Sequence, residues 1–332
     1  MGFAVRRVVT GVDDRGRESV IADGPAPGVG PESGPAFSTV LWVGAPPAGL
    51  YDGGDPPEGP FALEPPVGGL SSRVIRIPPP PAGATGDDRW LRVPGDDPDR
   101  PGMHTTDTLD LMVVLDGEIV LGLDDGEHHF GPGDFAIQRG TAHRWRVVGE
   151  RPCTYAVTML RPDPTGPAPA FALVTRSGAE GGERGPRRVV TGRGEDGSSA
   201  VSDGTPPVVL RPGGAEGAVL VDLWQTGGPL VTCDQGGDPE GPWVLDPLGL
   251  GVAFRLVDLP LGSGQRGEGW HATPTIDIDF IVGGAVELEL RDQAPVRLET
   301  GDVVVQRGTE HLWRPVGEQR LRMVSVMIGI DQ

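Results

Sequence analysis

The sequence predicts an all-β protein that contains two copies of one domain. Its 332 residues include 54 Gly and 36 Pro, which fall between short apolar runs and therefore indicate many turns. The hexapeptide RRVVTG occurs at Arg6–Gly11 and again, unchanged, at Arg187–Gly192. A repeat at this long period indicates tandem domains, and no stretch shows the 3.6-residue period of an amphipathic helix.

Later matches between the copies set the expected domain limits. IADG at 21–24 answers VSDG at 201–204, and GGDPPEGP from Gly53 answers GGDPEGP from Gly236. We expect a first domain over residues 1–165, a Pro- and Gly-rich linker over 166–186 and a second domain over 187–332. Copy one has an extra polar loop between Arg73 and His104. We expect this loop to reshape the mouth of its pocket, which favours copy one as the active copy.

Within each copy the apolar runs are short and alternate with turn signals. Leu111–Leu123 has the pattern of two strands that form a hairpin around Asp116-Gly117. Phe280–Leu290 repeats this pattern around Gly283-Gly284. Several strands at this spacing predict a sandwich or a small barrel in each copy.

Charge and composition exclude several classes of function. The net charge of −19 and the pI of about 4.6 argue against nucleic acid or an anionic membrane surface as a partner. All 28 basic residues are Arg, which excludes Schiff-base chemistry on a lysine. Neither a signal-peptide pattern nor a long apolar stretch is present, so we expect a cytoplasmic protein. Cys153 and Cys233 could form one disulfide, but we expect two reduced thiols.

Histidine carries the strongest chemical signal. The chain has six His, and four of them fall at matching positions of the two copies: His104 with His271, and His143 with His311. Asp110 and Asp277 follow the first His of each pair at equal spacing. Neutral imidazoles and a carboxylate are groups that hold metals or transfer protons.

These positions resemble the two sequence motifs of the cupin superfamily, and their duplication resembles a bicupin. Gly102, His104, Asp110 and Gly117 keep the register of the first motif. The second motif is matched by Gly133, Gly140 and His143, and copy two repeats both motifs through His271, Thr273, Asp277, Gly284, Gly301, Gly308 and His311. The resemblance implies two tandem cupin-type double-stranded β-helix (jelly-roll) barrels, each with a divalent metal inside. It departs from the family at Thr106 and Thr273, which replace a second His, and at both Asp residues, which replace a longer Glu.

Two arrangements of these side chains are open. In the first, His104, Asp110 and His143, and likewise His271, Asp277 and His311, hold Fe, Zn, Ni or Mn, and two His with one carboxylate is also the set of non-haem iron oxygenases. In the second, His104 and Asp110 form a hydrogen-bonded pair in a metal-free pocket, and the Thr hydroxyls satisfy nearby polar groups. No phosphate loop or dinucleotide motif appears, so no nucleotide cofactor is expected.

Neighbouring residues complete the predicted pocket. Trp145 and Trp313 follow a motif His by two residues, so in a strand they share its face and, with Thr106 and Thr273, are candidates for substrate contact; core packing is the alternative for both Trp residues. The segment from Gln138 to Thr141, repeated from Gln306 to Thr309, is interpreted as a turn, although its arginine (Arg139 or Arg307) could attract an anionic ligand.

We therefore expect an enzyme of specialised metabolism that acts on a small organic molecule. His104, Asp110 and His143 would catalyse a non-redox cyclisation, isomerisation, dehydration or decarboxylation, with or without a metal. A non-haem iron dioxygenase and a non-catalytic small-molecule binding protein are the alternatives. Because exposed sheet edges need cover, we expect a pseudo-dimer within the chain or a homodimer.

Overall fold

The chain is all-β, as predicted. The computed structural model describes residues 4–29, 37–45, 49–55, 62–176, 186–206, 209–211, 216–240, 243–264 and 269–330. In these ranges the strands form two large and two small sheets. The short 3₁₀ helices η1 (Gly86–Arg89) and η3 (Leu248–Leu250) lie between strands. None of the helices found there is long and apolar enough to cross a membrane.

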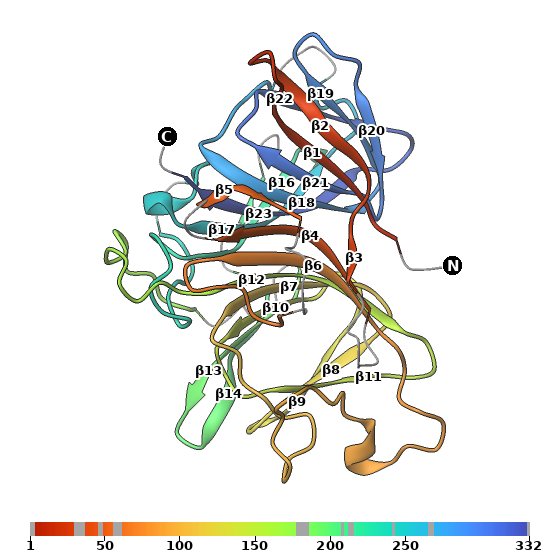
Figure 1. The fold of residues 1–332 in the computed structure, drawn as a ribbon, viewed down its shortest axis with the longest axis vertical. Coiled ribbons are helices and arrows are strands. Elements are labelled where there is room, and N and C mark those ends of the chain that lie inside the picture. Colours follow the sequence, from red (N-terminus) through yellow and green to blue (C-terminus); the bar gives the residue numbers. More distant parts are fainter. Residues whose placement is uncertain are drawn as a thin grey trace.

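The first barrel is a large sheet facing a small one (Figure 1). The large sheet has the order β14 (Gly197–Gly204), β13 (Arg188–Gly194), β10 (Phe135–Arg139), β7 (Leu109–Asp116), β12 (Cys153–Leu160), β6 (Leu70–Ile77), β4 (Phe37–Ala45) and β3 (Gly28–Val29), with β5 (Gly49–Gly54) paired to β4. The small sheet has the order β11 (Arg144–Val147), β8 (Ile119–Leu123) and β9 (Gly126–Phe130).

The second barrel repeats this plan. Its large sheet has the order β15 (Val209–Leu210), β16 (Val219–Gln225), β17 (Val252–Leu259), β23 (Leu321–Gly329), β18 (Thr275–Gly283), β21 (Val303–Arg307), β1 (Arg6–Val12) and β2 (Glu18–Pro25). Its small sheet has the order β20 (Val296–Glu299), β19 (Ala285–Leu290) and β22 (His311–Val316).

The two predicted hairpins are wrong, because each turn carries the chain from one sheet to the other. β7 pairs with β10 and β12 in the large sheet, whereas β8 pairs with β9 and β11 in the small one. The turn residue Gly117 has φ of 78°, and a Cβ there would lie 2.5 Å from the carbonyl oxygen of Pro152. Gly284 occupies the equivalent corner between β18 and β19, with φ of 74°.

The two large sheets exchange their first strands. β1 pairs in parallel with β21 of the second barrel, and β13 pairs in parallel with β10 of the first. Figure 1 shows the red strands β1 and β2 among the blue strands, and the green strands β13 and β14 beside the first barrel. Each sheet therefore draws strands from both sides of the expected linker, of which residues 177–185 lie outside the described part of the chain. The limits 1–165 and 187–332 remain a prediction about the repeat in the sequence.

This exchange explains why RRVVTG occurs twice. The first Arg of each copy pairs with the Asp of the next repeated motif: Arg6 Nε with Asp23 Oδ1 at 2.8 Å, and Arg187 Nε with Asp203 Oδ1 at 2.8 Å. These pairs link β1 to β2 and β13 to β14, so they hold each exchanged hairpin together.

The second Arg of each copy fastens the exchanged strand to the other large sheet. Arg188 donates to the carbonyl oxygen of Leu223 at 2.7 Å and to Asp238 Oδ1 at 2.5 Å. Arg7 donates to the carbonyl oxygen of Leu41 at 2.8 Å and to Asp55 Oδ1 at 2.6 Å. The repeated GGDP segments supply both aspartates, so these sequence repeats stabilise the pairing of the two barrels.

Three apolar cores follow from the alternation of side chains along the strands. One lies between the two large sheets and joins Leu111 and Phe135 of the first barrel to Phe254 and Ile278 of the second. The rings of Phe135 and Phe254 meet edge to face at 5.7 Å. The other two cores fill the barrels themselves. The barrels therefore form a pseudo-dimer within the chain.

Candidate functional site

Strand alternation places the predicted carboxyl groups inside the barrels. On β7, Leu109 and Leu111 belong to the core between the barrels, whereas Met112 belongs to the core of the first barrel. Asp110 shares the face of Met112 because side chains two apart point the same way. The equivalent Asp277 on β18 is also buried, at 5% exposure, between Ile276 and Ile278 of the shared core.

The two motif histidines of the first barrel lie side by side. Their backbones form two reciprocal hydrogen bonds of 2.9 Å, and their imidazole centroids are 4.3 Å apart. The Nδ1 atom of His104 lies 2.9 Å from the carbonyl oxygen of Gly102, and that of His143 lies 2.9 Å from the carbonyl oxygen of Thr141. A carbonyl partner requires a proton on Nδ1, so Nε2 of each neutral ring is left as an acceptor.

The second barrel repeats this histidine pair. His271 and His311 are linked by backbone hydrogen bonds of 3.1 and 2.9 Å, and their ring centroids are again 4.3 Å apart. Their Nδ1 atoms lie 2.8 Å from the carbonyl oxygen of Gly269 and 2.9 Å from that of Thr309. The two motif histidines therefore lie side by side in both copies.

Burial keeps the imidazoles of His104, His143 and His311 neutral. Desolvation, reinforced by the neighbouring His104, lowers the pKa of His143 to about 3. Desolvation also lowers the pKa of His104, although the carboxylate of Asp96 opposes this shift. The pKa of His311 falls to about 4 for the same reasons as that of His143. Near neutral pH these three rings can accept a proton or a hydrogen bond at Nε2 but carry no charge.

Asp110 is a buried carboxyl group poised to gain or lose a proton near neutrality. Desolvation raises its pKa to about 7, while the Thr108 hydroxyl and the Arg73 guanidinium oppose this rise. Its Oδ1 atom is buried and has no hydrogen-bond partner among the described residues. A buried acceptor left unpaired costs free energy, so Asp110 is a group that a ligand could satisfy.

Sequence reasoning missed an arginine in each barrel. Arg73 on β6 is 3% exposed and acts electrostatically on Asp110; its guanidinium donates to Ser71 Oγ at 2.7 Å and to the carbonyl oxygen of Ala62 at 2.9 Å. Arg255 occupies the same place on β17 and acts in the same way on Asp277. The signal was available, because an Arg inside an otherwise apolar strand recurs at the matching position of both copies.

The two barrels differ in how the carboxyl groups are partnered. Arg255 forms a buried ion pair with Asp222, with Nε and Oδ1 2.6 Å apart. Asp279, where the first barrel has Met112, adds a second buried carboxyl two residues after Asp277. Desolvation and its neighbour Asp277 raise the pKa of Asp279 well above the usual range. The second barrel thus has a buried carboxyl group at a position where the first barrel has an apolar side chain.

The two Thr residues that replace the family's second His belong to hydroxyl chains. Thr108 donates to Thr106 at 3.0 Å, and Thr275 donates to Thr273 at 2.7 Å. Thr273 in turn donates to Asp277 Oδ2 at 3.4 Å. These hydroxyls satisfy one another, as the metal-free arrangement predicted, whereas no hydrogen bond joins His104 to Asp110 in the described structure.

The predicted metal ligands do not fit a metal as they are arranged. Throughout the described ranges, no three or more His, Cys, Asp or Glu side chains lie close enough together to hold an ion. Each barrel brings two imidazoles together, but the shorter Asp side chain stays beside the buried arginine. Two donors fall short of the three or four protein ligands of a catalytic metal site.

We expect purified protein to contain transition metal well below one ion per barrel. The His104→Ala and His271→Ala double variant should have the same metal content as the wild type, because neither pair is completed by a third donor. Elemental analysis of protein prepared without added metal measures this. Near-stoichiometric metal that disappears in the double variant would contradict the expectation and revive the Lewis-acid and dioxygenase mechanisms.

Both motif tryptophans lie beside the histidines, as their spacing predicted. Trp145 and Trp313 are each 8% exposed, and their rings meet those of His143 and His311 edge to face at 6.0 and 5.5 Å. Trp145 also stacks on Tyr155 at 6.4 Å. They are part of the barrel cores; contact with substrate remains a prediction.

The extra loop of copy one covers the outside of its small sheet. Trp90 lies under the guanidinium of Arg144, 4.0 Å from its ring centroid, and the Leu91 amide donates to the carbonyl oxygen of Trp145 at 2.8 Å. Further along the loop, Asp96 accepts a 2.7 Å hydrogen bond from the Gly102 amide. The loop therefore supports the segment that carries His104.

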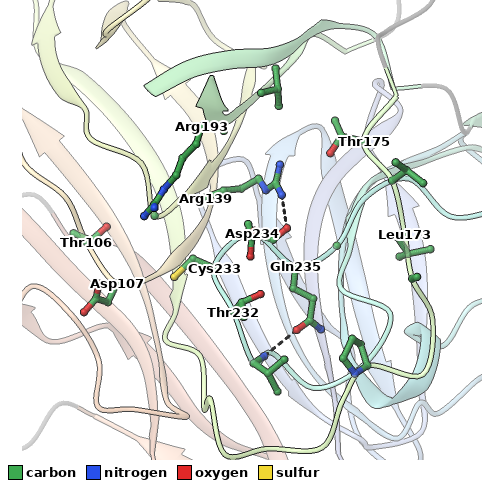
Figure 2. Close-up of a pocket in the computed structure, with 18 of the residues that line it drawn as sticks. Thr106, Asp107, Arg139, Leu173, Thr175, Arg193, Thr232, Cys233, Asp234 and Gln235 are labelled. Atoms are coloured by element: carbon green, nitrogen blue, oxygen red, sulfur yellow. Dashed lines mark hydrogen bonds between the residues drawn. The ribbon is translucent and has the colours of Figure 1, made fainter. Parts of the chain in front are cut away.

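A cavity of about 980 Å³ lies outside both barrel cores, where the two barrels and the linker meet (Figure 2). Of the predicted site residues, Thr106 lies on its wall, and Arg139 of the repeated QRGT segment lies on the wall as well. Sequence reasoning did not predict this cavity, since its walls come from segments far apart in the chain.

Comparisons with known proteins connect short stretches of the chain to fungal biosynthesis. No protein-family model matches the chain. Phomopsin biosynthesis cluster proteins C′ and D from Diaporthe leptostromiformis are each 56% identical over 52 residues, which is 14% of this chain and 28% of theirs. Oryzines biosynthesis cluster protein J from Aspergillus oryzae is 44% identical over 64 residues, 19% of this chain and 34% of that protein. The alignments thus span about a third or less of the length of these relatives.

Solved structures align with most of the chain at low identity. Protein Ylba from E. coli has a TM-score of 0.48 at 11% identity, over 92% of this chain and 87% of its own. AerE from Microcystis aeruginosa has a TM-score of 0.46 at 11% identity, over 91% of this chain and 96% of its own. A Lactobacillus farciminis oxalate decarboxylase has a TM-score of 0.44 at 10% identity, over 92% of this chain and 84% of its own.

The strand arrangement and the motif positions of the chain itself describe its fold. Each copy has a large sheet facing a small one, with the motif histidines paired between them and the motif glycines at the corners where the chain changes sheet. These features are those of the fold that the resemblance to two tandem cupin-type barrels implied.

Proposed function

We propose that the chain is an enzyme of specialised metabolism that moves a proton on a small organic molecule inside a barrel. The observation that carries this proposal is the buried carboxyl of Asp110, whose pKa of about 7 suits a general acid or base near neutral pH. Strongly perturbed ionisable groups next to a specific charge are typical of active sites. The partial likeness to fungal biosynthesis cluster proteins supports the metabolic setting.

Each barrel residue would have a role that follows from its charge. As a carboxylate, Asp110 would take a proton from a carbon or hydroxyl of the substrate and return it to another position. Arg73, buried beside it, would stabilise the negative charge that develops on the substrate. The neutral His104 and His143 would orient substrate hydroxyl groups through Nε2. This division of roles suits a cyclisation, isomerisation, dehydration or decarboxylation.

A proton-transfer assay that needs no known substrate tests this proposal. Wild-type protein incubated in heavy water with a metabolite extract of the source organism should introduce deuterium into at least one metabolite, detected by mass spectrometry. Asp110→Asn should slow this exchange by a factor of about 100 to 10,000, the usual contribution of a general base. Because the carboxylate is the base, the rate should rise as the pH passes through about 7.

Asp277→Asn serves as the matched variant, because it removes the equivalent carboxyl from the second barrel. Loss of exchange in only one of the two variants would show which barrel is active. An unchanged rate of deuterium exchange in the Asp110→Asn and Asp277→Asn double variant would contradict the proposal. Binding of a metabolite without any exchange would instead favour a non-catalytic binding protein, the second candidate, which the cavity between the barrels supports.

A further inference from the structure

We propose that the cavity between the two barrels binds a small organic monoanion with an apolar body, such as an aryl or alkyl carboxylate. The cavity, of about 980 Å³, has the size of a small-molecule site. Its walls come from the end of β10, the linker, β13 with β14, and the segment after β16 (Figure 2). It therefore exists only when both barrels and the exchanged strands are in place.

Arg139 provides a guanidinium group without an acidic partner in the described structure. It donates to the carbonyl oxygen of Asp234 and lies 5.5 Å from the ring centroid of Trp224. Burial lowers its pKa, whereas the nearby Asp234 charge opposes this effect. In a chain of net charge −19, a half-buried cation that faces a cavity and lacks an ion pair is available for an external anion.

The equivalent arginine of copy two shows the contrast. Arg307 occupies the position of Arg139 in the repeat and lies 5.6 Å from the centroid of Trp42, the counterpart of Trp224. Its guanidinium, however, has a carboxylate partner in Asp52, with Nη2 and Oδ1 3.6 Å apart. The guanidinium of Arg307 therefore has a carboxylate partner, whereas that of Arg139 has none in the described structure.

Arg193 adds a second cation at the rim of the same cavity. Figure 2 shows its side chain extending from β13 toward Thr106 and Asp107. In the described structure it forms neither an ion pair nor a hydrogen bond, and copy one has Val12 at the matching position. Two guanidinium groups thus face a cavity that has two carboxylates, Asp107 and Asp234, on its wall. Because Asp107 is already paired with Arg161, with Oδ2 and Nη2 3.6 Å apart, one positive charge is left over, which suits a ligand with one negative group and disfavours a polyanion.

Apolar side chains on the wall specify the other end of the ligand. Phe171 of the linker is 46% exposed and Val201 of β14 is 44% exposed, and both face the cavity. Leu173 and Val231 extend this surface. A ligand with a charged end and an apolar end would contact the cations and at the same time remove these exposed apolar side chains from water.

Binding of phenylbutyrate, compared with the uncharged phenylbutyramide of the same shape, tests the site by calorimetry on the full chain. The acid should bind about tenfold or more tightly than the amide, because only the acid makes charge-assisted hydrogen bonds. Arg139→Gln and Arg193→Gln should each remove most of this preference. Arg307→Gln, the matched control, should leave it unchanged because that arginine already has a partner.

Cysteine labelling locates the bound probe. Cys233 lies on the cavity wall, whereas Cys153 is fully buried in the core of the first barrel. Phenylbutyrate should slow alkylation of Cys233, measured by mass spectrometry at mildly alkaline pH, and Arg193→Gln should weaken this protection. Equal binding of the acid and the amide would overturn the proposal. So would an Arg193→Gln variant that keeps both the preference for the acid and the protection of Cys233, since Arg193 is exposed and its replacement should not disturb the fold.

This site is separate from the carboxyl groups inside the barrels. Asp110→Asn and Asp277→Asn should therefore keep their preference for the acid. Loss of phenylbutyrate binding in these variants would place the probe inside a barrel and count against the cavity.

Discussion

Cut within the linker and produced separately, neither half of the chain is expected to fold on its own. A fragment ending at residue 176 lacks β13 and β14, so the edge of β10 and the core around Val189 would be exposed. A fragment beginning at residue 186 lacks β1, whose Val8 and Val9 are 0% and 3% exposed in the intact chain. Both fragments should be insoluble or unfolded by circular dichroism and size-exclusion chromatography.

Produced together, the same two fragments should associate and recover the circular dichroism spectrum of the whole chain. A fragment over residues 26–206, similar in length to the first half but with β13 and β14 retained, serves as the control. We expect it to keep more β-structure than the fragment ending at residue 176. Two halves that each melt cooperatively as monomers would contradict reciprocal strand exchange.

Asp238→Asn should lower the free energy of unfolding by about 3–5 kcal/mol, because it leaves the buried Arg188 guanidinium without its counter-charge. Both side chains of this ion pair are 0% exposed. The equivalent change in copy one, Asp55→Asn, removes an aspartate that is 60% exposed and should cost about 0–1 kcal/mol. Urea denaturation of the two variants beside the wild type measures the difference.

A double variant separates loss of charge pairing from loss of packing. Arg188→Met combined with Asp238→Leu removes both charges and leaves apolar groups in their place, so it should recover much of the lost stability. Equal destabilisation by Asp238→Asn and Asp55→Asn would show that burial does not govern these pairs.

Much of this protein could be predicted from the sequence alone. Alternating apolar runs between Gly and Pro turns depend on local geometry, so they predicted an all-β chain correctly. The repeat predicted two copies of one barrel, and the motif register grouped His104 with His143, and His271 with His311, in one expected site of each copy. These features follow from spacing along the chain, which is retained when the chain folds.

Tertiary structure alone decided the remaining features. A turn signal at Gly117 predicts a change of direction, but it does not say which sheet the next strand joins. RRVVTG marked a repeat, yet only the packing of two sheets explains why each copy pairs with the other barrel. The separation of Asp110 from the histidines, its place beside Arg73 and the cavity at Arg139 all depend on contacts between distant segments. Such contacts are set by how strands pair across the whole molecule, so a local pattern can mark a residue such as Arg73 but does not say which distant residue it will meet.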